Sequence, residues 1–337
     1  MKRPQKPPRY PYRPIWSLGK LSLVLGVPQQ VLEDVAKVAS SSYRLAKAVV
    51  KPDGSIRQPF DALEPLKGIQ KRIKERLLDK VIFPDYLTGS LKGRDSRMNA
   101  ALHSGSALVL CEDISNFFPS TTATLVERIW SEFFGFSPEV ARLLTLLTTK
   151  DATLPQGACT SSHLANLAFW QEEHALYERL QTKGIRYSRY VDDVAVSSKK
   201  PLSKQDLSRC IADIYAMMGR AGYKPKRKKQ EIQRANTAMR VTKLVTNRHP
   251  AIPAAERKAI RAAVYQLEQR LKLGNIEGLQ KALNSVSGRV SRLCQMHPAE
   301  GLLLKLRISE VRTSLRAGLP AILANPSANE RQSIEST

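Results

Sequence analysis

Two adjacent aspartates, Asp192 and Asp193, lie between apolar runs in the segment RYVDDVAVSS, which spans residues 189–198. Neighbouring carboxylates repel each other, and one of them takes up a proton unless a cation lies beside the pair. A divalent cation such as Mg²⁺, which prefers oxygen ligands, removes that conflict. The pair therefore indicates a metal site at the mouth of a β-hairpin. Aspartates are also common in ordinary polar β-turns, and the segment alone leaves that alternative open.

A third carboxylate is expected from a neighbouring strand. The apolar run LVLCEDI, residues 108–114, is typical of a buried strand and ends in Glu112 and Asp113. In phosphoryl transfer, two metal ions about 4 Å apart activate the attacking oxygen and stabilise the leaving one. Asp113 and the aspartate pair therefore predict this chemistry at the ends of two strands.

The composition indicates a polyanionic partner. The 337 residues include 54 Lys and Arg against 30 Asp and Glu, which is a formal net charge of +24. An excess of this size favours nucleic acid over a membrane, the alternative being a soluble basic protein without such a partner. No apolar run approaches the roughly 20 residues of a membrane span. The four cysteines form no CxxC pair, which fits a reducing cytoplasm.

The spacing of apolar residues changes along the chain. Up to about residue 247 it predicts an α+β mixture that includes strands at 184–190 and 194–198, one long helix at 160–181 and an amphipathic helix at 204–222. Beyond about residue 254 the pattern is helical. Residues 222–316 hold 21 Lys and Arg against 6 Asp and Glu, an excess of 15. A carboxylate-bearing α+β part is therefore followed by a basic helical part.

Several segments resemble the motifs of reverse transcriptases, in the order of that family. YVDD (190–193) resembles the catalytic hairpin, DISNFF (113–118) resembles the first catalytic motif, and LPQGACTS (154–161) resembles the motif behind the incoming nucleotide. Further resemblances, to a lysine motif, a primer grip and two finger segments, lie at 222–230, 241–247, 54–73 and 88–103. Each motif is weak alone, whereas the ordered set is specific.

Within this family the chain most resembles the bacterial retron branch. The branch signature Asn-Ala-x-x-His is matched by NAALH, residues 99–103, and the short length also fits. There is one departure, because Lys243 stands where retron enzymes usually have the glycine of a Val-Thr-Gly run. A lysine does not adopt positive φ as freely as a glycine does, so the consequence of Lys243 stays open at this point.

The resemblance implies an α+β right-hand polymerase. Fingers and a palm, whose antiparallel sheet is backed by helices, would be followed by an all-helical thumb. The implied divisions are a basic N-terminal arm and helix at 1–40, fingers at 41–107, a palm at 108–247 with an interleaved fingers segment at about 122–152, a basic helical thumb at 248–318 and a flexible tail at 319–337.

The resemblance also implies roles for residues of the catalytic motifs. Asp113, Asp192 and Asp193 would hold two Mg²⁺ ions, and the backbone carbonyl of Ile114 would complete a shell. Phe118 would be the steric gate that excludes a ribose hydroxyl, so that the product is DNA. The alternative for Phe118 is a place in the hydrophobic core.

Other residues are implied to contact nucleotide or RNA. The nucleotide-binding set comprises Arg57, Lys92 and Arg94 on the triphosphate, Gln156 and Gly157 in the pocket, and Lys229 as proton donor to the leaving pyrophosphate. The RNA-binding set comprises Asn99, His103, Arg257, Arg261, Arg289 and Arg292. The alternatives are a structural role for His103 and an ordinary solvated surface for the cations.

The implied function is that of an RNA-directed DNA polymerase of retron type in the bacterial cytoplasm. It would reverse transcribe a structured noncoding RNA into RNA-linked single-stranded DNA (msDNA) in anti-phage defence, with a separate toxin or effector protein as a further partner. Two alternatives remain. One is a defence or abortive-infection reverse transcriptase that works without a fixed template, and the other is an RNA-binding structural subunit of a nucleoprotein complex.

Overall fold

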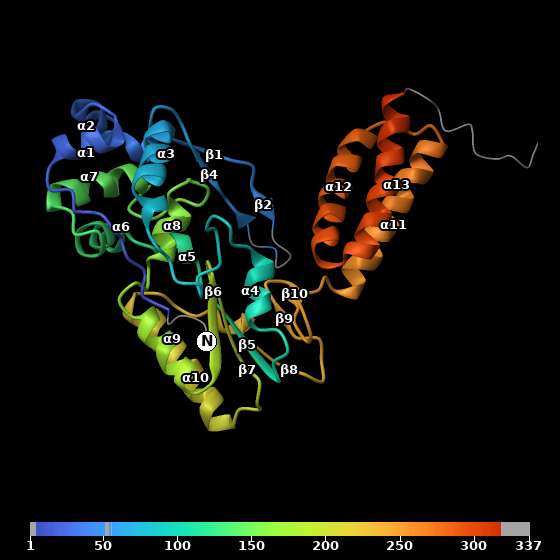
Figure 1. The fold of residues 1–337 in the computed structure, drawn as a ribbon. Coiled ribbons are helices and arrows are strands. Elements are labelled where there is room, and N and C mark those ends of the chain that lie inside the picture. Colours follow the sequence, from blue (N-terminus) through green and yellow to red (C-terminus); the bar gives the residue numbers. More distant parts are fainter. Residues whose placement is uncertain (1–4, 51–53, 55, 318–337) are drawn as a thin grey trace, which may run out of the picture. The chain divides into compact units, whose positions relative to one another are not determined.

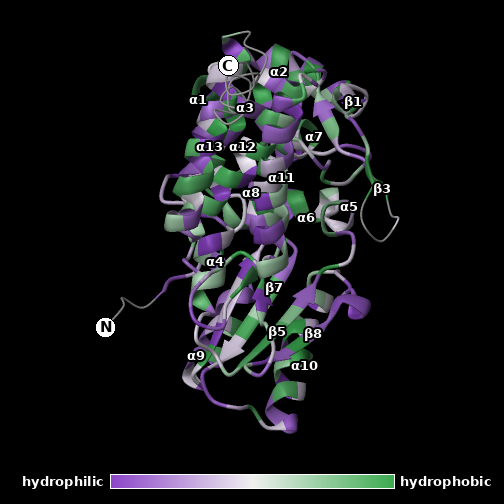
Figure 2. Cartoon of the chain, turned by 90° about the vertical axis from the view of Figure 1, so that its right-hand side faces the viewer, coloured by the Kyte–Doolittle hydropathy of each residue, from purple (hydrophilic) through white to green (hydrophobic). Residues whose placement is uncertain are grey.

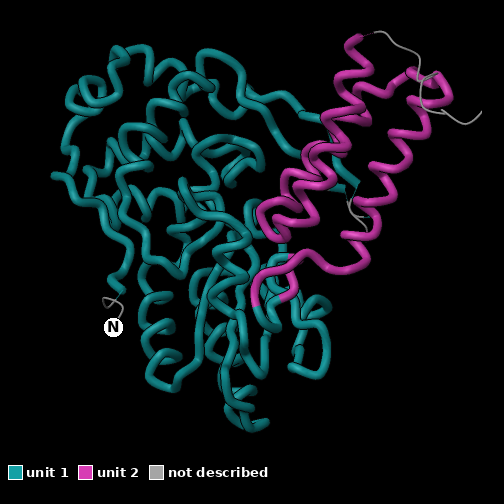
Figure 3. The backbone as a smooth tube through the Cα atoms, turned by 45° about the vertical axis from the view of Figure 1, so that its right-hand side comes forward, with its two compact units in different colours: residues 1–242, 246–248 teal, residues 243–245, 249–337 magenta. Residues whose placement is uncertain are grey.

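The computed structural model describes residues 5–50, 54 and 56–317. The chain divides into two compact units, drawn in different colours in Figure 3. Unit 1 comprises residues 1–242 and 246–248, and unit 2 comprises residues 243–245 and 249–337. The expected tail at 319–337 and the first four residues of the expected arm lie outside the described residues.

The N-terminal part of unit 1 combines helices with short antiparallel ladders (Figure 1). Strand β1 pairs with β4, and β2 pairs with β3. The elements are α1 (Leu18–Leu25), α2 (Gln29–Lys37), the 3-10 turn η1 (Ala39–Ser41), β1 (Tyr43–Leu45), β2 (Val49–Val50), β3 (Ile56–Arg57), β4 (Phe60–Ala62), α3 (Leu66–Arg76), the 3-10 turn η2 (Leu78–Lys80) and α4 (Ser96–Leu102).

A four-stranded antiparallel sheet forms the framework of the candidate site. Its spatial order is β6-β7-β5-β8. The strands are β5 (Leu108–Asp113), β6 (Ile185–Tyr190), β7 (Asp193–Ser198) and β8 (Glu231–Arg234). Both faces of β5 are covered, since Leu108 and Leu110 belong to the main core and Val109 packs in a separate cluster with Met239 and Val241, which explains its nearly continuous apolar run. Helix α4 and helix α9 (Glu173–Thr182) both contact β6.

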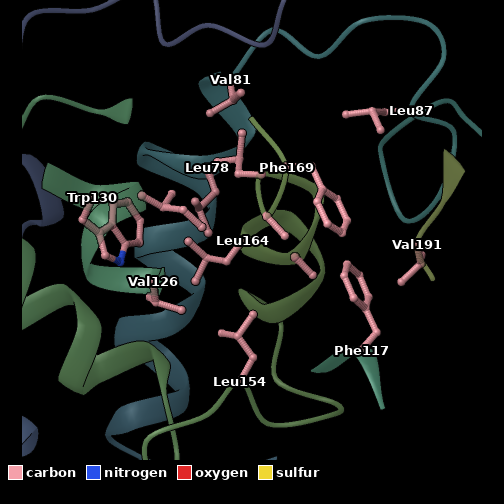
Figure 4. Packing of buried hydrophobic residues seen from close by; sticks show 14 of the residues in the cluster. Leu78, Val81, Leu87, Phe117, Val126, Trp130, Leu154, Leu164, Phe169 and Val191 are labelled. Carbon is pink, nitrogen blue, oxygen red and sulfur yellow. The ribbon is translucent and has the colours of Figure 1, made fainter. Parts of the chain in front are cut away.

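The expected long helix at 160–181 is wrong, because the structure divides it into α8 (Ser161–Asn166) and α9 with a turn between them. Three consecutive residues of that turn, Leu167, Ala168 and Phe169, are all buried. Figure 4 shows Phe169 in the core, together with Leu164, Trp130 and Leu78.

The remaining helices of unit 1 complete this core. They are α5 (Phe117–Ser120), α6 (Ala123–Arg128), the π-helical turn η3 (Ile129–Phe133), α7 (Pro138–Thr148) and α10 (Lys204–Arg220). The amphipathic helix expected at 204–222 is confirmed as α10, with Ser203 as its N-cap and Gly222 at a φ of +82° after its end. The 3-10 turn η4 (Arg227–Lys229) and β9 (Arg240–Val241) follow.

The described residues of unit 2 form a bundle of three helices, as the helical pattern beyond residue 254 predicts. After β10 (Leu244–Val245) it contains α11 (Ala254–Lys272), α12 (Leu279–Met296) and α13 (Pro298–Arg316). Figure 2 shows hydrophilic and hydrophobic residues in each of these helices. A Cβ on Gly301 would lie 2.5 Å from the Cα of Cys294, so α12 and α13 approach closely there. None of the helices in the described ranges combines the length and hydropathy that a bilayer crossing requires.

Candidate active site

The turn between β6 and β7 carries the aspartate pair. Tyr190 lies opposite Asp193 in the β6–β7 ladder, which leaves Val191 and Asp192 as the turn itself. Val191 has a φ of +61°. A β-branched residue in this left-handed region is strained by roughly 1–3 kcal/mol, so the surrounding structure must stabilise the turn.

The register of the sheet brings the third carboxylate to the same place. Asp113, the last residue of β5, lies opposite Asp193 of β7. The backbone N–H of Ile114 donates to the carbonyl of Asp192 at 3.0 Å, which joins the end of β5 to the turn. The two strand ends predicted to be neighbours are therefore neighbours.

These residues line one cavity of about 600 Å³. Several residues from the other motifs face the same space. The cavity is lined by Asp113, Ile114, Phe118, Gln156, Gly157, Asp192, Asp193, Lys226 and Lys229, among others. Segments that are far apart in the sequence therefore meet around the carboxylates.

Lys229 of η4 holds the carboxylate of Asp113. Its Nζ lies 2.8 Å from Asp113 Oδ2. This hydrogen bond, with the nearby charges of Asp193 and Asp192, raises the pKa of Lys229 above its usual value, so the side chain stays a cation at neutral pH. The N–H of Lys226 also donates to the Asp113 carbonyl at 2.7 Å, which fixes the segment before η4 to the end of β5.

The carboxylates suit a hard divalent cation in donor type. Three aspartates and Ile114 line one cavity, and oxygen is the ligand that Mg²⁺ prefers. In the described part of the chain, no three His, Cys, Asp or Glu side chains are gathered into a group able to hold a metal. The Lys229 ammonium is the cation at Asp113, so metal binding at Asp113 would replace that contact.

The two phenylalanines that follow Asp113 have different surroundings. Phe117 is buried, and its ring stacks on that of Phe169 at a centroid distance of 6.1 Å (Figure 4). Phe118 is only partly buried and lines the cavity. The core position therefore belongs to Phe117, and the gate role of Phe118 stays a prediction.

Gln156 and Gly157 belong to a loop that lies against β4. The N–H of Phe60 donates to the Gln156 carbonyl at 2.6 Å. Gly157 has a φ of +108°, and a Cβ there would lie 2.5 Å from the carbonyl oxygen of Phe60. Both the conformation and the close approach require glycine at this position.

Comparisons with known proteins identify the family of the chain. Residues 49–244 match the family described as "Reverse transcriptase (RNA-dependent DNA polymerase)". The chain is 34% identical to the Retron Se72 reverse transcriptase of Salmonella heidelberg (strain 579083-10), over 90% of this chain and 82% of that protein. It is 31% identical to the Retron Ec48 reverse transcriptase of Escherichia coli, over 83% of this chain and 72% of the relative. The chain belongs to the retron reverse transcriptases.

Lys243, which stands where retron enzymes usually have a glycine, lies in a left-handed part of the backbone. Thr242 has a φ of +47° and Lys243 a φ of +66°. The backbone at position 243 is therefore left-handed, which a glycine adopts without strain, and in this reverse transcriptase a lysine adopts it instead. The substitution keeps the turn rather than removing it.

Two of the three cations expected at the triphosphate, Lys92 and Arg94, do not line the cavity. The Arg94 guanidinium donates to the carbonyls of Phe83, Pro84 and Leu87, so it holds the 83–87 loop together. Lys92 is exposed and does not line the cavity. The side chain of Arg57 lies outside the described part of the structure.

The structure does not support direct RNA contact by the branch-signature residues of this retron reverse transcriptase. Asn99 is 1% exposed and His103 is 0% exposed, because both side chains point into the protein. The ring nitrogens of His103 lie 2.8 Å from Ser197 Oγ and 2.7 Å from Ser188 Oγ, and burial lowers the pKa of His103 to about 3. Asn99 Oδ1 accepts from the hydroxyl of Thr88 at 2.8 Å.

The arginines expected to bind RNA in unit 2 are mostly paired within the bundle. Arg257 and Arg261 both contact Glu300, and Arg292 lies 2.6 Å from Glu256. Within the described residues, Arg289 takes part in no ion pair with a carboxylate. The four arginines therefore differ in their surroundings, although the sequence gives the same prediction for all of them.

Sequence reasoning missed a charged pair behind the aspartate turn. Arg189 is 0% exposed and Glu173 is 2% exposed. A signal was present, because Arg189 stands in a strand whose other side chains are largely buried, beside the YVDD motif. An arginine in such a strand needs a buried partner.

Proposed function

We propose that this retron reverse transcriptase copies a structured noncoding RNA into single-stranded DNA that stays attached to the RNA, the product called msDNA. One observation carries the catalytic part of this proposal. The sheet register places Asp113 opposite Asp193, and both line one cavity with Asp192, Phe118, Gln156 and Lys229. These are the residue types that templated DNA synthesis requires at one point.

In the proposed mechanism, Asp113, Asp192, Asp193 and the carbonyl of Ile114 would hold two Mg²⁺ ions, which would supply charge stabilisation to the attacking and leaving oxygens. Phe118 presents its ring to the sugar and excludes a 2′-hydroxyl. Lys229 carries a proton on Nζ at neutral pH, and this proton is available to the leaving pyrophosphate.

The proposed architecture assigns the four-stranded sheet to a palm and the helices and ladders before it to fingers, with the segment at about 122–152 as an interleaved part of the fingers. Unit 2 is the proposed thumb. The division between the units at 242–249 supports this assignment, because it falls beside the expected palm–thumb boundary at 247/248. The excess of basic residues in 222–316 supports a role of this region in holding nucleic acid.

The nucleic acid that purifies with the protein tests this proposal. The wild-type protein should carry DNA whose sequence is complementary to a co-purified RNA, and RNase should shorten that product. The Asp192→Asn/Asp193→Asn double variant should carry the RNA without the DNA. DNA unrelated to any RNA would indicate untemplated synthesis, and RNA without DNA in both proteins would indicate a structural subunit.

The proposal extends to phage defence in a bacterial host, with a separate effector protein as the partner. The family resemblance supports this part. Plating of phages on cells that carry the complete locus should show protection with the wild-type chain and none with the Asp192→Asn/Asp193→Asn variant. Equal protection by both would separate any defence role from DNA synthesis.

A further inference from the structure

The side chain of Arg189 is completely enclosed behind the aspartate turn. It extends from β6, one residue before the YVDD motif. Its Nε lies 2.6 Å from Glu173 Oε1 and its Nη2 lies 2.8 Å from Glu173 Oε2, which is a two-pronged contact. Glu173 is the first residue of α9, and its Oε1 also accepts from the hydroxyl of Tyr187 at 2.7 Å.

The other donors of the same guanidinium reach the backbone. Nη1 donates to the carbonyl of Val191 at 3.0 Å, and Nη2 donates to the carbonyl of Asn166 at 2.8 Å. Val191 is the left-handed residue of the turn, directly before Asp192. One rigid group therefore joins the end of α8, the start of α9 and the catalytic turn.

The backbone of Gly89 confines the turn as well. A Cβ on Gly89 would lie 2.5 Å from the nitrogen of Val191 and 2.8 Å from the carbonyl carbon of Tyr190. The carbonyl of Gly89 accepts from Asn166 Nδ2 at 2.9 Å, and Asn166 in turn gives its own carbonyl to Arg189. Hydrogen bonds thus link Gly89, Asn166, the Arg189 guanidinium and the aspartate turn.

We propose that Arg189 is a positioning residue for DNA synthesis, which holds the Val191 carbonyl and so fixes the turn that presents Asp192 to the cavity. The proposal rests on the catalytic role proposed above for Asp192. Net stabilisation alone explains this arrangement poorly, since a buried ion pair is often no better for stability than apolar side chains of the same volume. An apolar side chain would fill the space but would leave the strained turn without its donor.

The substitution Arg189→Lys tests the proposal in the full-length protein. A lysine keeps the positive charge beside Glu173, but its donors are on one nitrogen and cannot reach Glu173, Asn166 and Val191 together. We expect kcat for DNA synthesis to fall on the order of 10²-fold, as for a misplaced catalytic group. The KM for deoxynucleotide and the affinity for RNA should stay within about threefold of wild type, and more Mg²⁺ should be needed for half-maximal rate.

Arg186→Lys is the matched control on the same strand. The Arg186 guanidinium also donates to two backbone carbonyls, those of Leu102 and Ser104, but it does not touch the turn. Arg186→Lys makes the same change of side chain on the same strand, and it should show an unchanged kcat and Mg²⁺ requirement. An equal fall of kcat in both variants would show a general loss of stability and would overturn the proposal.

A folded Arg189→Lys protein with wild-type kcat would also overturn it. If Arg189→Lys shows no cooperative melting, the double variant Arg189→Met/Glu173→Gln replaces it, because it leaves no unpaired buried charge. The same selective fall of kcat is expected from the double variant, and wild-type kcat there counts against the proposal. Asp192→Asn distinguishes failure of the catalytic role of Asp192 from failure of the positioning role of Arg189. If Asp192→Asn is fully active, the catalytic assignment itself fails. If Asp192→Asn is inactive and Arg189→Lys is fully active, only the positioning role fails.

Discussion

Unit 1 of this retron reverse transcriptase has a buried ion pair in addition to exposed ones, whereas the ion pairs described in unit 2 are all partly exposed. In unit 1, the side chains of Arg189 and Glu173 are 0% and 3% exposed, and their contacts continue to the backbone of the aspartate turn. In unit 2, the side chains of Arg261 and Glu300 are 49% and 23% exposed, and the contact joins two helices of the bundle. The buried pair cannot exchange its partner, whereas the surface pair can.

This difference indicates what each kind of pair can do. Exposed ion pairs contribute about 0–1 kcal/mol and can give way to a phosphate when nucleic acid binds. A buried pair is costly to separate, and its value lies in the geometry that it imposes. We therefore expect substitutions in the sheet of unit 1 to act on the rate of synthesis, and substitutions in unit 2 to act on binding.

The largest effect is expected for the carboxylates of unit 1. Asp192→Asn/Asp193→Asn should lower the rate of primer extension by about 10³-fold or more, because the amides keep the size but lose the charge that binds Mg²⁺. RNA affinity should stay close to wild type. Asp34→Asn, at an exposed aspartate that pairs with Lys37, is the control and should extend primers normally. Loss of RNA binding together with activity would erase the contrast between the two units.

Phe118 should show a smaller effect on the choice of nucleotide. Phe118→Ala should reduce the preference for deoxynucleotides over ribonucleotides, measured as a ratio of kcat/KM, by roughly 10- to 100-fold. Phe118→Tyr keeps the ring and should keep the preference. If both variants discriminate as wild type does, the gate lies on another residue of the cavity.

The sequence predicted that Asp113 and the aspartate pair are neighbours because β-strand geometry is local and regular. An apolar run that ends in Asp113, and two runs that flank the pair, permit few arrangements other than adjacent strands. The division of the expected long helix was not predicted, because residues 160–181 contain no glycine or proline that would mark a break. Tertiary packing decided that element, as it decided the buried position of His103.

The buried histidine offers a test of stability against pH. The pKa of His103 is about 3 in the folded protein and near 6.5 when unfolded, so between these values the unfolded chain binds the extra proton. Stability should therefore fall as the pH decreases below about 6.5, by about 2 kcal/mol between pH 7 and pH 5 for this group.

His103→Gln should lack this component, so denaturant unfolding at pH 7 and pH 5 should show a smaller difference than for wild type. His249→Gln is the control, because His249 is exposed in unit 2. A wild-type pH dependence in His103→Gln would mean that the histidine is protonated inside the folded protein.

The ion-pair partners of the surface arginines could not be predicted from the sequence. Helical spacing places Arg289 and Arg292 on the same helix, α12, and predicts equal contacts with phosphate. Only the three-dimensional structure shows that Glu256, 36 residues away in the sequence, neutralises Arg292. Net charge counts residues of each sign and contains no information on which of them already have partners.

The smallest expected effect separates these two arginines. If unit 2 holds the phosphates of an RNA or a hybrid duplex, each contact should add about 0.7–0.9 to the slope of log affinity against log salt. Arg289→Ala should flatten the slope by about that amount, and Arg292→Ala should flatten it less, because a phosphate must compete with Glu256 for that guanidinium. Arg307→Ala, at an arginine that pairs with Glu268, is the matched control and should resemble Arg292→Ala.

Affinity for the RNA that purifies with the protein should be measured across a salt series for the wild type and the three variants. Equal flattening by the three substitutions would show that intramolecular ion pairs do not limit phosphate contact. Unchanged slopes in all three would instead place nucleic-acid binding outside α12 and α13, and the contrast drawn between the two units would then be wrong for unit 2.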